Sequence, residues 1–300
     1  MKSGFIALIG RPNVGKSTLM NHLIGQKIAI TSEKPQTTRN RIRTVFTDER
    51  GQIVFEDTPG LIQSRNKLDE YMMDVSSRVM KDADAVLWIT EASEYIGASE
   101  KQIAKDLERI RKPVILVINK TDKLSNKNVL LKEMEEFRKL FRFNDIVPVS
   151  ALRDTNTDEL LNILFSVLPE GPQFYDAETV TNEPMKEIAA EMIREQALRL
   201  LKEEVPHGIA VMVQKYSERP SGELIDIEAD IICERENHKG IIIGKGGSML
   251  KKIGTLARKS IEDTAEKKVN LKLFVKVRKD WRENPYQVKD FGYDTKKLKK

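Results

Sequence analysis

The chain has 300 residues, 40% hydrophobic and 32% charged, a balance typical of soluble globular proteins and long enough for about two domains. The single cysteine, Cys233, excludes an internal disulfide and indicates a reducing compartment, and no run approaches the ~20 consecutive apolar residues that cross a bilayer. Residues 239–300 hold 18 basic and 7 acidic residues, whereas residues 1–180 hold 26 of each. This asymmetry predicts a nucleic-acid or anionic-membrane partner, unless the lysines form only a solvated surface.

The first motif follows an apolar run at residues 5–9 that predicts a buried strand. It reads Gly10-Arg-Pro-Asn-Val-Gly-Lys-Ser17, the G-x-x-x-x-G-K-[ST] pattern of a phosphate-binding loop, and a helical pattern follows it. Backbone N–H groups ahead of a helix bind phosphates, Lys16 should reach the β- and γ-phosphates, and Ser17 should hold Mg²⁺. The predicted nucleotide contacts of this loop are Gly10, Arg11, Pro12, Asn13, Val14, Gly15, Lys16, Ser17 and Thr18.

Apolar runs and amphipathic segments alternate along the first half of the chain. Strands are predicted at residues 5–9, 41–48, 52–57, 85–89, 114–118 and 146–149, and helices near 16–25, 67–82, 99–111, 127–141 and 157–168. The turn at residues 48–51 predicts an antiparallel hairpin between the second and third strands. The remaining pattern predicts an α/β domain with a mostly parallel sheet and helices on both faces.

Three further motifs follow predicted strands, where parallel sheets bind their ligands. Asp57-Thr-Pro-Gly60 could hold the Mg²⁺ hydration shell through Asp57 and contact the γ-phosphate through the Gly60 amide. In Asn119-Lys-Thr-Asp122, the Asp122 carboxylate can accept both donors on one edge of guanine, Lys120 can cover the base, and Asn119 can tie the loops together. Ser150-Ala151-Leu152 could bind the guanine oxygen through a backbone N–H.

In this order, the motifs resemble those of the translation-factor-like GTPases, and Gly-Arg-Pro-Asn-Val-Gly-Lys-Ser with Asp-Thr-Pro-Gly resembles the Era/EngA/TrmE group most. The resemblance implies GTP and GDP as ligands and GTP hydrolysis as the activity. It also implies that the polar loop at residues 34–40 is a switch whose second threonine, Thr38, binds Mg²⁺, although the sequence does not separate Thr38 from Thr37. The implied Mg²⁺ ligands are therefore Ser17, Thr38 and Asp57.

The position after Gly60 lacks a side chain that could orient the attacking water. Many GTPases have glutamine there, whereas this chain has Leu61, so slow intrinsic hydrolysis is expected. In the group that the chain resembles, a loop asparagine matching Asn13 is associated with K⁺, which would supply added positive charge; the alternative is that Asn13 only shapes the loop. The predicted catalytic set is Lys16, Thr38, Asp57, Gly60 and Asn13.

A second domain follows Pro169-Glu-Gly-Pro172 and a polar linker. The pattern predicts a helix from Pro184 to about Pro206, strands at residues 209–216 and 223–233, a short apolar segment, Gly244-Lys-Gly-Gly247, a helix to about Glu266, and a strand over residues 268–281. Among the apolar residues beside the glycines, Ile241, Ile242, Ile243 and Ile253 are expected in the core more than under bound bases.

This order with a Gly-x-x-Gly between two helices resembles a type II KH domain, whose clamp grips single-stranded nucleic acid. The predicted RNA contacts are Ile243, Gly244, Lys245, Gly246, Gly247, Lys251, Lys252, Arg258, Lys276 and Arg278. The aromatic residues of the basic tail, Trp281 among them, could stack on bases or anchor the tail to its own domain, and the sequence favours neither.

We therefore expect a GTP-binding domain at residues 1–172, a linker at 173–183, a KH domain at 184–281 and a basic tail at 282–300. The combination resembles the Era family of bacterial ribosome-assembly GTPases along essentially the whole chain. The resemblance implies binding near the 3′ end of 16S rRNA, maturation of the 30S subunit, a monomer, and a cytoplasmic location with some peripheral association with the inner face of the cell membrane. Two alternatives stay open: an RNA-binding assembly scaffold that uses nucleotide only structurally, and a membrane-surface signalling GTPase.

Overall fold

The computed structural model describes residues 1–61, 64–93, 95–124 and 126–296, and the last four residues of the predicted basic tail lie outside this range. The packing of the chain defines two compact units. The first comprises Met1–Ala29, Thr38–Gln63 and Met72–Asn182, and the second comprises Ile30–Thr37, Ser64–Tyr71 and Glu183–Lys300. Two short segments from the first half of the sequence therefore pack with the C-terminal part, which a division at one linker does not anticipate.

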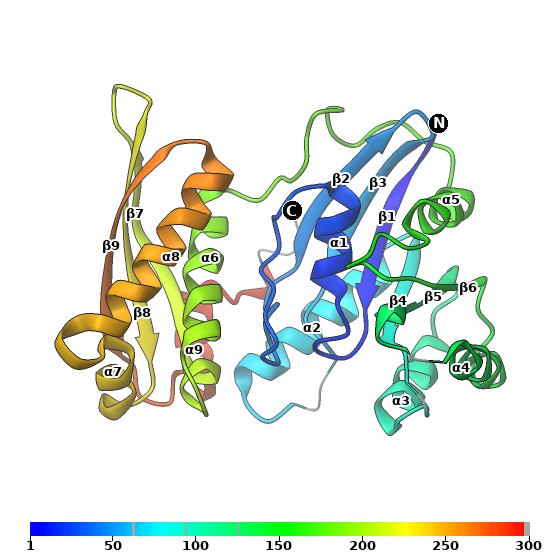
Figure 1. The fold of residues 1–300 in the computed structure, drawn as a ribbon, viewed down its shortest axis with the longest axis horizontal. Coiled ribbons are helices and arrows are strands. Elements are labelled where there is room, and N and C mark those ends of the chain that lie inside the picture. The colour runs from blue at the N-terminus through cyan, green and yellow to red at the C-terminus, as the bar shows by residue number, and fades with distance from the viewer. Residues whose placement is uncertain (62–63, 94, 125, 297–300) are drawn as a thin grey trace. The chain divides into compact units, whose positions relative to one another are not determined.

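The first unit is built on a six-stranded sheet of order β2-β3-β1-β4-β5-β6 (Figure 1). Its strands are β1 (Lys2–Ile9), β2 (Ile42–Asp48), β3 (Gly51–Asp57), β4 (Ala85–Glu91), β5 (Val114–Asn119) and β6 (Asp145–Pro148). The hairpin strands β2 and β3 pair antiparallel and the other neighbours pair in parallel, as the sequence predicts. Continuous apolar runs form β1, β4 and β5 because these central strands are covered on both faces.

Helices connect the strands of this sheet: α1 (Lys16–Ile24), α2 (Lys67–Asp82), α3 (Ala98–Leu107), α4 (Lys127–Leu140) and α5 (Thr157–Val167). The start of α2, up to Tyr71, belongs to the second unit. The predicted α/β class is confirmed. The parallel arrangement brings the loops after β1, β3, β5 and β6 to one edge of the sheet, and these loops carry the sequence motifs.

The second unit places a three-stranded sheet of order β7-β8-β9 beside helices (Figure 1). Its elements are α6 (Met185–Leu200), β7 (Ala210–Glu218), β8 (Leu224–Cys233), α7 (Glu236–Ile243), α8 (Ser248–Ala265), β9 (Lys268–Val277) and α9 (Pro285–Asp290). β7 pairs antiparallel with β8, and β8 pairs in parallel with β9. Helix α6 ends at Leu200, earlier than the predicted Pro206, because Leu201 is already extended and Glu203 takes a left-handed conformation.

The C-terminal residues differ from the prediction of a strand to Trp281 followed by a tail, because they form a shorter strand and the helix α9. The prediction that the strand continues to Trp281 is wrong: β9 ends at Val277, and Asp280 turns the chain with a φ of 48°. Trp281 is fully buried, donates from Nε1 to the Gly208 carbonyl over 2.9 Å, and stacks on Tyr293. For Trp281 and Tyr293 the structure thus favours anchoring over base stacking. No helix within the described residues is long and apolar enough to cross a membrane.

Candidate functional site

The loop between β1 and α1 wraps around the ammonium group of Lys16. This side chain is 6% exposed, and its Nζ donates to the carbonyls of Gly10, over 3.4 Å, and Arg11, over 3.1 Å. Gly10 has a φ of +146°, and a Cβ there would lie 2.1 Å from the Ile89 carbonyl oxygen of β4. Only glycine therefore lets the loop leave the sheet at this point, with the lysine held inside it.

Three oxygen-bearing side chains meet beside this loop. The Asp57 Oδ2 accepts from the Ser17 hydroxyl over 2.5 Å and from the Thr38 hydroxyl over 3.2 Å, and the two hydroxyls lie 3.0 Å apart. The other carboxylate oxygen, Oδ1, is buried and has no hydrogen-bond partner among the described residues. Hard oxygen donors around an unsatisfied buried carboxylate fit Mg²⁺, which usually takes one or two carboxylates and completes its shell with waters and phosphates. Thr37 is not part of this cluster, because its hydroxyl contacts Ser32 and the Lys34 carbonyl.

Burial sets the electrostatics of this cluster. It raises the pKa of Asp57, against the opposing effects of Lys16 and the two hydroxyls, and it lowers the pKa of Lys16, which the Asp57 charge partly restores. Lys16 therefore compensates the negative charge of the Asp57 carboxylate only in part. A divalent cation at Oδ1 would supply it and would favour the ionised form of Asp57.

The predicted base-binding loops are tied to the phosphate loop by Asn119. Its Nδ2 donates to the Val14 carbonyl over 3.0 Å, and its Oδ1 accepts from the Ala151 amide over 3.2 Å. The Lys120 ammonium reaches the Asn13 carbonyl and the Glu91 carboxylate, so its stem bridges the same loops. These bonds gather loops from three strand ends into one surface.

The guanine-recognition residues lie on this surface. Asp122 is exposed, and its Oδ1 accepts from the Ser150 hydroxyl over 2.5 Å, which orients the carboxylate. At the turn after β6, Ala151 is buried and Leu152 is 77% exposed. The arrangement offers an oriented acceptor to a base with two adjacent donors.

The remaining predicted residues of this site lie around the loop. Thr18 is exposed in the first turn of α1. Gly60 packs against the loop, because a Cβ there would lie 2.7 Å from the Pro12 nitrogen. Asn13 has a φ of 66°, a left-handed conformation that asparagine tolerates well, which gives its loop-shaping alternative structural support.

The Gly-Lys-Gly-Gly segment of the second unit forms a tight turn between α7 and α8. Gly244 has a φ of +72°, and a Cβ there would lie 2.8 Å from Met249 Cβ. Lys245 and Gly246 are exposed at the tip, while Ile242 and Ile253 are fully buried and Ile241 is 48% exposed. The buried isoleucines hold the turn, and its main chain stays open to solvent.

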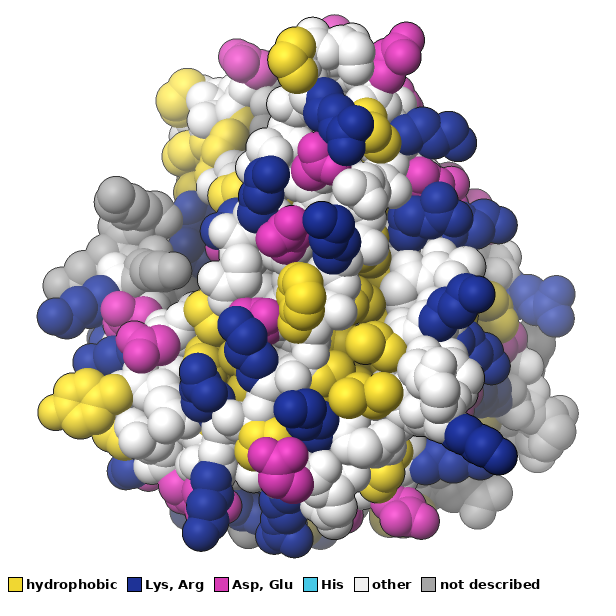
Figure 2. All heavy atoms as spheres, turned by 90° about the vertical axis from the view of Figure 1, so that its left-hand side faces the viewer, with side chains coloured by type: hydrophobic (Ala, Val, Ile, Leu, Met, Phe, Trp, Pro, Cys, Tyr) yellow, Lys and Arg dark blue, Asp and Glu magenta, His cyan; other side chains and the backbone are white. Residues whose placement is uncertain are grey.

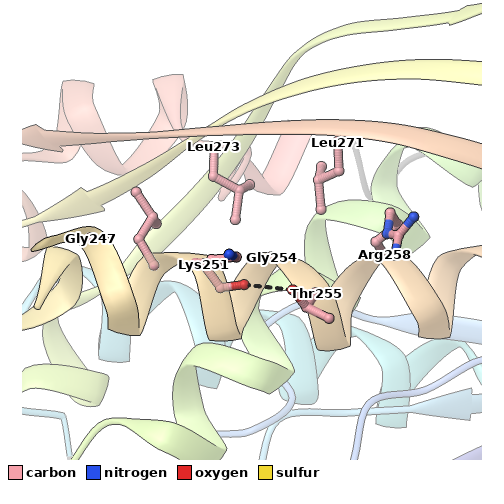
Figure 3. Close-up of a pocket in the computed structure, with 8 residues that line it drawn as sticks. Gly247, Lys251, Gly254, Thr255, Arg258, Leu271 and Leu273 are labelled. Carbon is pink, nitrogen blue, oxygen red and sulfur yellow. Dashed lines mark hydrogen bonds between the residues drawn. The ribbon is translucent and has the colours of Figure 1, made fainter.

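A groove of about 430 Å³ runs from this turn along α8 and under β9. It is lined by Gly247, Leu250, Lys251, Gly254, Thr255, Arg258, Leu271 and Leu273 (Figure 3). Figure 2 shows one face of the molecule, with apolar side chains near its centre and Lys and Arg side chains around them, interspersed with Asp and Glu. An apolar floor with basic residues at its rim can take bases inward and phosphates outward.

Both halves of the chain match known protein families. The family model described as a 50S ribosome-binding GTPase matches residues 5–120, and a KH domain model matches residues 204–282. The chain is 50% identical to GTPase Era of Lactobacillus helveticus over 297 residues, which cover 99% of this chain and 98% of the relative. It is 45% identical to GTPase Era of Clostridioides difficile over 295 residues, 98% of this chain and 99% of the relative.

The chain belongs to the Era family of GTPases. Solved Era structures share its fold. A Tyr-to-Ala variant of Aquifex aeolicus Era bound to GDP·AlF4⁻ is 39% identical and superposes with a TM-score of 0.94 over 98% of this chain and 99% of that one. Era in complex with MgGDPNP and nucleotides 1506–1542 of 16S ribosomal RNA is 40% identical, with a TM-score of 0.92 over the same 98% and 99% shares.

In this Era-family chain, some predicted RNA contacts lie away from the groove. Lys276 points to the opposite side of β9 from Leu273, since side chains alternate along a strand, and pairs with Asp230 over 2.7 Å. Arg278 follows the end of β9 and donates to the Val277 carbonyl, and Lys252 is exposed but does not line the groove. Lys251 and Arg258 do line it.

Some groove residues of this Era-family chain were not predicted from the sequence: Leu250, Gly254, Thr255, Leu271 and Leu273. Gly254 lets α8 approach β9, because a Cβ there would lie 3.3 Å from Leu273. The spacing of Gly247, Lys251, Gly254 and Arg258 places them on one helix face, and this signal was available in the sequence.

A second missed group lies behind the phosphate loop. Arg11 forms an ion pair with Glu100 of α3, which is 3% exposed. Glu133 of α4 accepts from the Ser93 amide over 3.0 Å, and burial, reinforced by the Glu100 charge, raises its pKa to about 7. The buried Glu100 therefore holds Arg11 in place, and no local sequence pattern predicts this ion pair.

Proposed function

We propose that this chain is a GTP-dependent switch that binds GTP or GDP with Mg²⁺, hydrolyses GTP to GDP and phosphate, and binds single-stranded 16S rRNA near its 3′ end during assembly and maturation of the 30S subunit. One observation carries the proposal: a single chain holds both the Ser17–Thr38–Asp57 oxygen cluster and the groove beside the Gly244–Gly247 turn. The Era structure with MgGDPNP and 16S rRNA nucleotides, aligned over 98% of the chain, supports this pairing of ligands.

In the first step, the residues of the chain bind and orient the triphosphate. Lys16 presents its ammonium group from inside the loop, and the N-terminus of α1 presents backbone N–H groups to the phosphates. Ser17, Thr38 and Asp57 would hold Mg²⁺, which, when bound, neutralises charge that develops on the phosphate oxygens. Asp122 accepts from the guanine edge, and Asn119 keeps the two ends of the site in register.

The chain offers no side chain at position 61 that could orient water, so positioning and electrostatics supply the rate enhancement. The groove residues Lys251 and Arg258 then contact the RNA backbone, while Leu250, Leu271 and Leu273 form the apolar floor for bases. The proposal includes a cytoplasmic monomer with partial peripheral association with the inner face of the cell membrane; the family resemblance carries these points.

K⁺ is part of the proposal as an additional charge near the phosphates, held with the help of Asn13. We expect GTP hydrolysis to be about tenfold faster in KCl than in NaCl at equal ionic strength, because a fixed cation stabilises developing negative charge. Asn13→Gly should remove this difference and keep the loop shape, since glycine adopts the φ of 66° freely. Steady-state phosphate release in the two salts checks this. Equal rates in both salts for the unmodified chain would refute the role of K⁺. An intact K⁺ effect in Asn13→Gly would mean that Asn13 only shapes the loop and does not help to bind K⁺.

The proposed function is tested by measuring RNA affinity in two nucleotide states. The probe is an RNA with the sequence of nucleotides 1506–1542 of 16S rRNA, titrated with the chain in Mg²⁺ and either GDPNP or GDP. We expect the affinity for this RNA to be about tenfold higher with GDPNP than with GDP, a coupling free energy of ordinary size. By reciprocity, bound RNA should raise the affinity for GDPNP relative to GDP by the same factor. A GTPase that binds this RNA equally well in both states would not be a switch, and RNA binding without GTP turnover would indicate a scaffold.

A further inference from the structure

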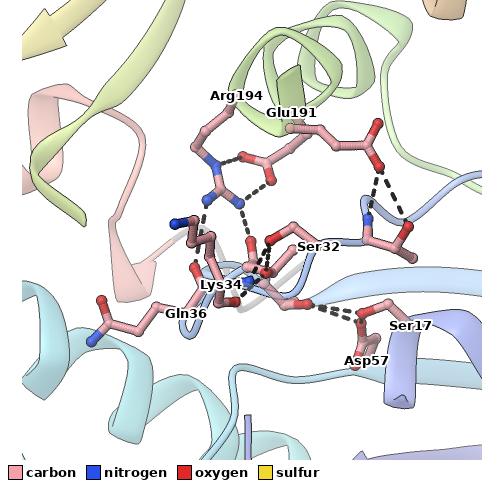
Figure 4. A network of polar contacts seen from close by, with 11 residues as sticks. Ser17, Ser32, Lys34, Gln36, Asp57, Glu191 and Arg194 are labelled. Atoms are coloured by element: carbon pink, nitrogen blue, oxygen red, sulfur yellow. Dashed lines mark hydrogen bonds and ion pairs between the residues drawn. The ribbon is translucent and has the colours of Figure 1, made fainter. Parts of the chain in front are cut away.

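The loop segment Ile30–Thr37 is held by helix α6. It packs in the same compact unit as Glu183–Lys300, and its contacts with α6 lie at both of its ends. At the first end, the fully buried Glu195 accepts from the Thr31 amide over 2.9 Å, and Arg199 donates to the Thr31 carbonyl over 3.1 Å. At the second end the partner is Arg194 (Figure 4).

Arg194 is an almost fully buried cation with a defined orientation. Its side chain is 1% exposed, and Glu191, one turn before it on α6, pairs with Nε over 3.1 Å and with Nη2. The guanidinium is planar, so this fork fixes the direction of the outward N–H groups. Those groups donate to the carbonyl oxygens of Gln36, over 3.5 Å, and of Thr37.

The bond to the Thr37 carbonyl fixes the peptide unit that leads into Thr38. A peptide unit is planar, so holding the oxygen of Thr37 sets the orientation of the plane that contains the Thr38 nitrogen and Cα. The preceding residue, Gln36, has a φ of 60°, and its side chain is tied to Asp69 over 2.8 Å, so the turn before this peptide is constrained as well. Thr38 then places its hydroxyl 3.2 Å from Asp57 Oδ2 and 3.0 Å from Ser17 Oγ.

We propose that Arg194 is a positioning residue for GTP hydrolysis: through the Thr37 carbonyl it places the Thr38 hydroxyl for Mg²⁺. The inference rests on the proposed function, because it concerns the same Mg²⁺ and GTP site. It assigns to a helix of the RNA-binding part of the chain a residue that the hydrolysis reaction needs. The guanidinium donates to two main-chain oxygens of the loop, so it acts on the path of the chain.

The test compares Arg194→Met with Arg199→Met in the full chain. Both substitutions remove an arginine of α6 that donates to a loop carbonyl, but the Arg199 partner, Thr31, is seven residues from Thr38, and Arg199 is 47% exposed. For Arg194→Met we expect the Mg²⁺ concentration at half-maximal GTP hydrolysis to rise, or kcat to fall, by about ten- to a hundredfold. Affinity for GDP should stay within about twofold of the unmodified chain, since Thr38 is expected to act with the γ-phosphate state. Arg199→Met should resemble the unmodified chain.

A double substitution separates positioning from general stabilisation. In a Thr38→Ala background, Arg194→Met should have little further effect on hydrolysis, because the group that it positions is absent. Independent, multiplying losses in the double variant would overturn the proposal, as would an Arg194→Met variant with unchanged Mg²⁺ dependence and kcat. Thermal unfolding shows whether Arg194→Met folds. If it does not, Glu191→Gln loosens the same fork and should shift the Mg²⁺ dependence in the same direction. An unchanged Mg²⁺ dependence in Glu191→Gln would also count against the proposal. Absence of Mg²⁺-dependent GTP hydrolysis in the unmodified chain would instead refute the proposed function.

Discussion

Lys16→Ala is expected to lower kcat/KM for GTP by about a hundred- to a thousandfold. The ammonium group is held inside the loop by the Gly10 and Arg11 carbonyls, so its charge is already placed before GTP arrives. In a buried site such a preorganised charge acts far more strongly than it would in water. Alanine also leaves Asp57 without its nearest counter-charge, which raises the pKa of that carboxyl further and weakens Mg²⁺ binding.

Single-turnover hydrolysis of radiolabelled GTP at saturating Mg²⁺ measures this loss, and equilibrium binding of a non-hydrolysable analogue separates affinity from chemistry. Lys101→Ala is the matched control, because Lys101 lies exposed on α3 and is not a residue of the phosphate loop. It should hydrolyse GTP at the unmodified rate. Turnover that survives Lys16→Ala unchanged would mean that the phosphate loop is not where GTP is hydrolysed, and the assigned site would be wrong.

Gly246→Asp is expected to weaken binding of the 16S rRNA probe by about ten- to a hundredfold at low salt, because it places a carboxylate where the RNA backbone is expected to pass. Gly246 lies at the exposed tip of the turn, and a Cβ there meets no heavy atom within 4 Å. Its φ of +58° is a left-handed value that aspartate and asparagine tolerate better than other residues, so the turn should keep its shape.

Gly246→Asn supplies the neutral control of nearly the same size and backbone preference. The difference in RNA affinity between the two variants then reports charge alone, and it should shrink as salt is raised from 50 to 300 mM, about the range over which screening of exposed charges becomes strong. GTP hydrolysis without RNA should be the same in both. Equal RNA affinities of the aspartate and asparagine variants would contradict RNA contact at the tip, and a membrane-surface GTPase would keep its function in both.

The sequence was most informative where chemistry depends on close spacing along the chain. The loop around Lys16, the Asp57 motif and the Asn119–Asp122 motif each lie within a few residues, and each follows a strand that its apolar run already indicates. The same holds for the Gly244–Gly247 turn between two helices. Strand and helix limits were close for the first unit, because continuous apolar strands and amphipathic helices have distinct periods.

The ends of elements in the second unit were less predictable. The alternation of apolar and polar residues predicted that the last strand reaches Trp281. Asp280 instead adopts a left-handed conformation, and Trp281 enters the core and donates to the Gly208 carbonyl. The side chains of Lys276 and Lys251 read alike in the sequence as basic residues of one domain. Only the pleat of β9 and the face of α8 show that Lys251 lines the groove and Lys276 pairs with Asp230 on the other side.

By itself, the sequence determined the fold class, the Era-type motifs, the two kinds of ligand and the absence of a water-orienting side chain at Leu61. Tertiary structure alone decided that Thr38, and not Thr37, shares the Asp57 cluster, that Glu100 holds Arg11, and that Arg194 holds the Thr37 carbonyl. The physical reason is the range of the contacts. Motif spacing and periodicity report neighbours within a few residues, whereas these pairs join groups that are 19 to 157 residues apart and meet only when the chain folds.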